Sequence, residues 1–202
     1  MIPGIQGYAE QADELIKRYE AVSFEEKHQP ELRILPVSPA LILDVGAGTG
    51  ADAAWFASKG HSVVAVEPTD ELREPGKSLH PSPVIEWVKD SLPDLALVLA
   101  RNQQFGAVML TAVWMHLDQK ERMIGMPNLN ALLAPGGVLV ITLRHGPVPD
   151  GRRMFDVRGD ETIALAKASD LQLIHCTHTE SIQDFNRAQH VTWTHLAFRR
   201  PT

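Results

Sequence analysis

The sequence predicts an α/β fold built on one mostly parallel sheet with helices on both faces. Three observations lead to this prediction: short apolar runs alternate with helix-like segments, the first run ends in closely spaced glycines, and a short polar stretch joins the last two strand-like runs. Near-continuous apolar strands separated by helices are typical of parallel sheets covered on both faces. The last two runs lie too close together for a crossover helix, which predicts a terminal antiparallel hairpin at the sheet edge.

The expected elements follow one another in a regular order. Strands are expected at residues 40–46, 62–67, 84–88, 105–113, 137–143, 171–178 and 191–198. Helices are expected at residues 8–21, 51–59, 70–73, 93–101 and 118–134. Pro75 is expected to interrupt the third of these helices, and Pro127 to disturb the last.

Length and composition predict one globular domain over residues 1–202, and its 44% hydrophobic content is enough for a continuous core and a ligand cleft. Residues 1–35 are expected to form an N-terminal helical lid segment, with ordinary packing of its helix as the alternative. The net charge of −6 gives no general attraction to nucleic acid or to an anionic membrane, which favours a small-molecule substrate.

The single cysteine, Cys176, cannot form an intramolecular disulfide, and no stretch has the apolar length of a membrane span. Both observations favour the cytoplasm. A monomer and a homodimer are equally compatible with the sequence.

The strongest motif is LDVGAGTG at residues 43–50, where the first strand turns into the first helix. Glycine lacks a Cβ, so such a loop turns sharply and lets a ligand approach the backbone, while free N–H groups at the helix start face it. The motif alone leaves two cofactors open, because Gly46, Gly48 and Ala51 also satisfy the dinucleotide fingerprint.

Two further acidic residues follow the next two strands. Glu67 ends the second strand, where a carboxylate can accept hydrogen bonds from ribose hydroxyls in either cofactor. Asp90 follows the third strand, where it could accept a hydrogen bond from an adenine amino group or could cap a helix. In register with the other two sites, ligand binding is the preferred interpretation of Asp90.

Taken in order, LDVGAGTG, VVAVEP, VKDSLPDL, MLTAVWMHL and LLAPGGVLVITL resemble a class I S-adenosylmethionine-dependent methyltransferase. The resemblance implies seven strands in the order 3-2-1-4-5-7-6 with the last strand antiparallel, and S-adenosylmethionine as cofactor. The binding residues it implies are Asp44, Gly46, Ala47 and Gly48 for the methionine part, Glu67 and Pro68 for ribose, Asp90, Ser91 and Leu92 for adenine, and Thr111 and Ala112 for the amino-acid end.

An acidic Asp44 before the glycines suits a cationic amino group better than a pyrophosphate, which favours S-adenosylmethionine over NAD. The expected function is therefore methyl transfer to a small-molecule acceptor. A nicotinamide-dependent oxidoreductase and a non-catalytic S-adenosylmethionine-binding module are the alternatives.

Candidates for acceptor chemistry lie just beyond the fourth and fifth strands. His116 and His145 are candidate bases, with loop packing as the alternative for each. Trp114 is a candidate wall of the acceptor pocket, with a core role or packing against the cofactor as the alternatives. Arg144 suits an anionic group on the acceptor, and the alternative is a solvated loop.

Two further patterns argue against other sites. His175 and His178 are three apart on an expected strand and point to opposite faces, so no metal site is expected there. The fourth strand ends in TAVW rather than in the Asn/Asp-Pro-Pro-aromatic tetrad of families that methylate amino groups of adenine or glutamine.

Overall fold

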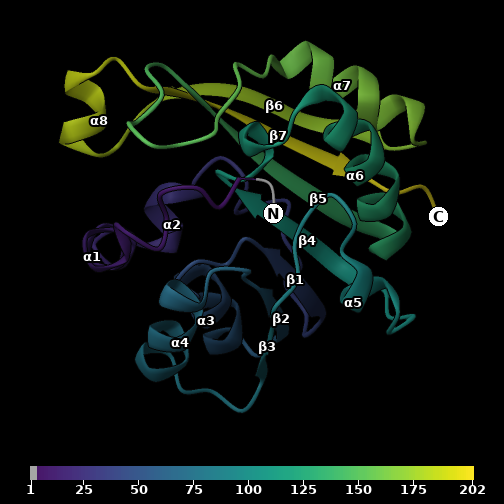
Figure 1. Ribbon diagram of the computed structural model, residues 1–202. Coiled ribbons are helices and arrows are strands. Elements are labelled where there is room, and N and C mark those ends of the chain that lie inside the picture. The colour runs from purple at the N-terminus through teal and green to yellow at the C-terminus, as the bar shows by residue number, and fades with distance from the viewer. Residues whose placement is uncertain (1–3) are drawn as a thin grey trace.

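The computed structural model describes residues 4–202 and contains one seven-stranded sheet (Figure 1). The strands are β1 (Leu41–Val45), β2 (Ser62–Val66), β3 (Ile85–Val88), β4 (Phe105–Thr111), β5 (Leu133–His145), β6 (Gln172–Glu180) and β7 (Thr192–Arg199). Their order is β3-β2-β1-β4-β5-β7-β6, with β7 antiparallel to both neighbours. The predicted fold class and strand order are confirmed.

The helices are α1 (Ala12–Glu20), α2 (Phe24–Lys27), α3 (Ala51–Ser58), α4 (Asp70–Leu79), α5 (Ala96–Leu99), the 3-10 helix η1 (Trp114–His116), α6 (Gln119–Leu132), α7 (Gly159–Ala168) and α8 (Asp184–Ala188). Alternate strand residues supply two separate cores. In β1, Leu43 packs toward a core that includes Met126 of α6 and Ala166 of α7, whereas Ile42 packs toward Phe56 of α3.

The Pro75 prediction is wrong, because α4 continues through Pro75 to Leu79. Pro127 lies inside α6, as in the expected helix over residues 118–134. A helical proline removes the N–H that would reach the carbonyl four residues earlier. That carbonyl belongs to Glu71 in α4 and to Met123 in α6, and both residues are exposed. Water can therefore take the place of the missing donor.

Three other boundaries differ from the expected ones. The first helix begins at Ala12, after a series of turns, and α5 spans only four of the nine residues expected. Leu95 adopts a left-handed φ of 47°, so the helix cannot extend backward through it. The stretch joining β6 to β7 contains the short helix α8.

The N-terminal segment lies across one end of the sheet. In Figure 1, α1 and α2 lie at the left, at the same end of the sheet as α8 and opposite the C-terminus. Because β7 is antiparallel and runs toward the C-terminus, that end is where the parallel strands finish. Ala12 and Leu15 of α1 pack against Leu72 of α4, which holds the segment there. Within residues 4–202, no helix has the length and apolar character needed to span a membrane.

Candidate active site

The glycine loop follows β1 and has a backbone that side chains rarely adopt. Gly46, Gly48 and Gly50 have φ values of 72°, 57° and 81°. The N–H groups of Gly46 and Ala47 both donate to the Val66 carbonyl, at 2.8 and 2.9 Å. A Cβ on Gly46 would lie only 2.5 Å from Val113 Cγ2. The loop is thus fixed against β2 and leaves its outer surface open to a ligand.

Glu67 lies directly beside this loop at the end of β2. Its Oε2 accepts a hydrogen bond from the Gly48 N–H at 2.9 Å, and its Oε1 accepts one from the Thr69 N–H at 2.8 Å. Burial raises the pKa of this carboxyl despite the two donors. Each oxygen keeps a further lone pair that could accept from a hydroxyl.

Asp90 serves as a helix cap in the structure. Its Oδ1 accepts from the Ser91 N–H at 2.8 Å, and its Oδ2 accepts from the N–H groups of Leu97 and Val98 at 2.8 and 3.1 Å. The cap holds Asp90, Ser91 and Leu92 on the wall of the cavity described below. Its predicted contact with adenine stays a prediction, and Oδ1 is the less occupied oxygen.

Asp44, near the end of β1, has a buried carboxyl group with one oxygen that has no hydrogen-bond partner among residues 4–202. The side chain is 1% exposed, and the oxygen in question is Oδ2. Burial, together with the charge of Asp52, raises the pKa of Asp44 to about 8. A cationic group placed here would satisfy the buried oxygen, which fits the amino group of the predicted cofactor.

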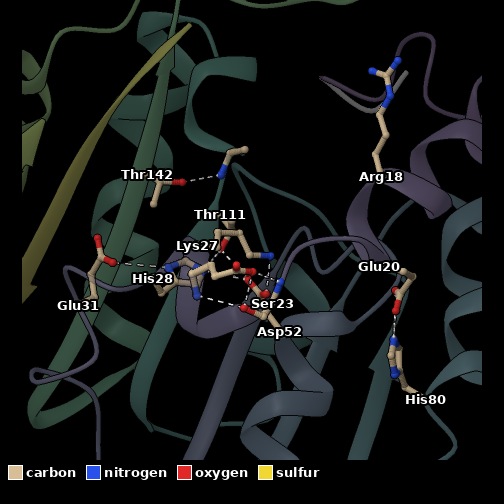
Figure 2. Close-up of polar contacts among 12 residues, drawn as sticks. Arg18, Glu20, Ser23, Lys27, His28, Glu31, Asp52, His80, Thr111 and Thr142 are labelled. Atoms are coloured by element: carbon tan, nitrogen blue, oxygen red, sulfur yellow. Dashed lines mark hydrogen bonds and ion pairs between the residues drawn. The ribbon is translucent and has the colours of Figure 1, made fainter. Parts of the chain in front are cut away.

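The end of β4 links the loop to β5 (Figure 2). The Thr111 hydroxyl donates to Asp52 Oδ2 at 3.0 Å, and the Ala112 N–H donates to Thr142 Oγ1 at 2.9 Å. Ala112 has a φ of 58°, a strained value for a residue with a side chain, and such strain is often found at functional sites.

A buried ionic network under this edge was not predicted. Asp52 lies 2.6 Å from Lys27 Nζ and 3.1 Å from His28 Nε2. Figure 2 shows these three side chains together below the end of β4. His28 and Glu31 are both fully buried, and Glu31 Oε1 lies 2.6 Å from His195 Nδ1. Despite the opposing effect of burial, the contact with Asp52 raises the pKa of His28. Lys27 and His28 stand in a polar stretch with no motif, so the sequence carried no signal for them.

His116 has a defined tautomer. Its Nδ1 lies 2.8 Å from the Arg153 carbonyl, which can only accept, so Nδ1 carries the proton. Nε2 then accepts a hydrogen bond from the Tyr8 hydroxyl at 2.9 Å. Burial lowers the pKa of His116, which favours this neutral ring. Arg152 lies over the Tyr8 ring, 3.6 Å from its centroid.

Three predicted acceptor residues lie elsewhere. Trp114 is fully buried in the core and packs near Gly125 of α6, so the predicted pocket-wall role is wrong and the core alternative is correct. Arg144 and His145 line a second hollow, away from the glycine loop. Arg144 donates to the Pro147 carbonyl at 2.7 Å, and His145 Nε2 lies 2.7 Å from Thr194 Oγ1. β5 extends two residues beyond its expected end and carries both side chains past the cavity.

One cavity of about 450 Å³ brings the remaining predicted residues together. Its cofactor half, as we call it, is formed by Asp44, Gly46, Ala47, Gly48, Glu67, Pro68, Asp90, Ser91, Leu92, Thr111 and Ala112. Its acceptor half is formed by Thr142, Thr179, Trp193 and His195, with Ser181, Ile182 and Gln183 from the turn after β6. The N-terminal segment, including Tyr8, Tyr19 and Lys27, covers both halves.

Comparison with known proteins supports the class that this geometry indicates. Residues 42–137 match a family described as methyltransferase domain. Glycine N-methyltransferase of Mus musculus is 28% identical over 134 residues, covering 56% of this chain and 46% of that protein. Demethylmenaquinone methyltransferase of Clavibacter sepedonicus is 31% identical over 126 residues, covering 61% and 49%. The chain thus spans about half the length of these curated relatives.

The fold itself extends further than the sequence match. The Burkholderia thailandensis 1,6-didemethyltoxoflavin-N1-methyltransferase, crystallised with 1,6-didemethyltoxoflavin and S-adenosylhomocysteine, superposes with a TM-score of 0.73 at 18% identity. The match covers 96% of this chain and 86% of that one. The fold is that of the Rossmann-like methyltransferases. Residues 42–137 match a methyltransferase domain, which supports the predicted class I S-adenosylmethionine-dependent methyltransferase and its cofactor.

Proposed function

We propose that this protein transfers a methyl group from S-adenosylmethionine to a small-molecule acceptor bound in the acceptor half of the cavity. The observation that carries the proposal is the continuity of the cavity from the glycine loop to the β6–β7 hairpin. A volume of about 450 Å³ lies within the usual range for small-ligand sites.

The chain's own residues fit the cofactor. Asp44 would pair with its amino group, Glu67 with the ribose hydroxyls, and Asp90 with the adenine. When bound, the cofactor supplies a methyl group already activated on a sulfonium, so the protein mainly aligns the acceptor and removes a proton where needed.

The charges along the cavity limit the choice of acceptor. Among the described lining residues, the Lys and Arg side chains are Lys27 and Arg18. Lys27 is paired with Asp52, and Arg18 forms an ion pair with Glu14. Because Arg144 lies in the second hollow, Arg18 would have to leave Glu14 to bind an anionic acceptor. A neutral acceptor needs no positive charge from the lining and fits it better.

We further propose that residues 1–35 act as a lid on a single domain of 202 residues. The contacts that support this proposal are Tyr8 on His116, Arg152 on the Tyr8 ring, and the Tyr19 ring, which would lie 3.3 Å from a Cβ on Gly48. Removal of residues 1–20 should leave the sheet folded but abolish transfer and weaken cofactor binding, because water would enter the cleft. Full activity of the truncated protein would refute the lid.

Calorimetry and a turnover assay test the function directly. Calorimetry should show one site for S-adenosylhomocysteine and weaker binding of NAD. The turnover assay adds S-adenosylmethionine with a panel of small phenols, amines, thiols and carboxylates, and S-adenosylhomocysteine should be released with at least one of them. Tighter binding of NAD would overturn the proposal. Binding without transfer to any compound would instead support the non-catalytic module.

A further inference from the structure

A row of polar side chains crosses the sheet at the carboxyl end of the parallel strands. Thr111 of β4 pairs with Thr142 of β5, and Thr142 pairs with His195 of β7. Paired residues of neighbouring strands point to the same face. Their face is the one covered by α2 and α3, because Met109 and Ala197, two residues away along β4 and β7, pack in that core. The row thus leads from the cofactor half into the acceptor half.

His195 lies in this row between Thr142 of β5 and Thr177 of β6, and it lines the cavity. The residue is 5% exposed, and it lines the acceptor half together with Thr179 and Trp193. Adjacent strands are about 4.8 Å apart, so the His195 backbone is roughly 10 Å from the end of β4, where the cofactor half begins. A small acceptor spans that distance, with the side chain of His195 reaching back toward it.

Glu31 fixes the ring of His195. A carboxylate only accepts hydrogen bonds, so the 2.6 Å contact with Glu31 Oε1 places the ring proton on Nδ1. In the neutral ring, Nε2 then carries the lone pair, and the Thr179 hydroxyl, 3.0 Å away, can donate to it. Although burial opposes it, the hydrogen bond with His195 and the nearby His28 ring, 3.7 Å away, lower the pKa of Glu31 to about 2 and keep it ionised.

We propose that His195 is the base that removes the proton from the acceptor, with Glu31 as the residue that positions it. This inference rests on the proposed function and predicts an acceptor with a neutral O–H or N–H group, which replaces the Thr179 hydroxyl at Nε2. The acceptor proton passes to Nε2, the freed electron pair bonds to the methyl carbon, and the carbon–sulfur bond breaks with its pair left on sulfur. The imidazolium keeps its Nδ1 proton, which stays hydrogen-bonded to Glu31, and then releases the new Nε2 proton to water.

The tautomer can be tested in the free protein. Nitrogen-15 NMR of the neutral His195 ring should show a protonated Nδ1 and an unprotonated Nε2. A ring protonated at Nε2 would overturn the proposal, because no lone pair would then face the cavity.

A second test uses the compound from the acceptor panel that gives the fastest release of S-adenosylhomocysteine. His195→Gln should lower kcat/KM at least 100-fold, while the Kd for S-adenosylhomocysteine stays within twofold. His178→Gln, on the exposed side of the same hairpin, should leave both values unchanged. If His195→Gln keeps more than a tenth of the wild-type kcat/KM, the proposed role of His195 as the base is wrong.

A third measurement separates proton removal from simple support of the pocket. A ring-fluorinated or otherwise acidified analogue of that acceptor, already ionised at the assay pH, needs no base, so the loss in His195→Gln should shrink below tenfold. If His195→Gln loses the same factor in kcat/KM with both acceptors, His195 is not the base and only supports the pocket. Wild-type protein that binds no S-adenosylhomocysteine would instead be a failure of the proposed function itself.

Discussion

The two halves of the cavity are built in different ways. In the cofactor half, the carboxylates that follow β2 and β3 contact residues near in sequence: Gly48 and Glu67 are 19 apart, and Asp90 and Val98 are 8 apart. In the acceptor half, His195 is held by Glu31, which is 164 residues away. The cofactor half therefore depends on local loops after successive strands, whereas the acceptor half forms only when the two ends of the chain meet around buried charges.

The largest effect is expected in the buried ionic network that joins Asp52, beside the cofactor half, to His28 and Glu31, which holds His195. Asp52→Asn keeps the side-chain volume but leaves Lys27 and His28 without their anionic partner, which should lower the free energy of unfolding by about 3 kcal/mol. Urea titration measures the change. Asp184→Asn removes an exposed ion pair with Arg187 and should be without measurable effect. Equal stability of the two variants would contradict the stabilising role of the buried network.

Removal of the Glu67 carboxylate should weaken cofactor binding and leave the fold intact. Glu67→Ala should cost about 1.5 to 3 kcal/mol in binding of S-adenosylhomocysteine, because charge-assisted hydrogen bonds are lost. The protein should stay folded, since the Gly46 and Ala47 N–H groups keep their bonds to Val66. Calorimetry compares the variant with Glu71→Ala on the exposed side of α4. Unchanged affinity in folded Glu67→Ala would show that the ribose role is wrong.

Protonation of Asp44 gives the cofactor half a pH dependence. With its pKa raised to about 8 by burial and then by Asp52, Asp44 is mostly protonated at pH 7 in the free protein. A bound ammonium group favours the carboxylate, so binding releases a proton and affinity rises with pH, by at most tenfold per unit, until about pH 8. Calorimetry at pH 6, 7 and 8 in buffers of different ionisation enthalpy measures this release. Asp44→Asn should remove the slope, and a pH-independent wild-type affinity would refute the pairing.

The smallest effect is expected at Tyr8, which covers the junction of the halves. Tyr8→Phe removes the hydroxyl that donates to His116 Nε2 and should lower the free energy of unfolding by about 1 kcal/mol. A double-mutant cycle with His116→Gln isolates the pair, and a coupling near 1 kcal/mol is expected. Additive effects would mean that the hydrogen bond contributes nothing.

Much of the fold was readable from the sequence because its main features are local. Apolar runs followed by glycines or acids mark the parallel strands, and the family resemblance carried by the motifs implies the strand order. The effect of Pro75 was misread because it depends on whether the carbonyl that the proline leaves unpaired is exposed to water, as at Glu71. Exposure is a property of the folded surface and has no local pattern.

The residues of the acceptor half were harder to predict from the sequence. His116 was singled out because it follows a strand end, and it lines the cavity. The same rule selected His145, which the longer β5 carries into the second hollow. His195 stands inside the last strand with no motif around it. Its distinguishing partner, Glu31, lies near the other end of the chain, so only the folded structure brings them together.

The connection between β6 and β7 has a consequence for how this protein can change over generations. Residues 181–191 supply Ser181, Ile182 and Gln183 to the acceptor half but touch none of the three acidic positions Asp44, Glu67 and Asp90 in the hydrogen bonds described above. Surface connections tolerate insertion and exchange better than the strands they join. Natural variation, or a mutant library confined to residues 181–191, can therefore change the lining of the acceptor half without changing the residues of the cofactor half.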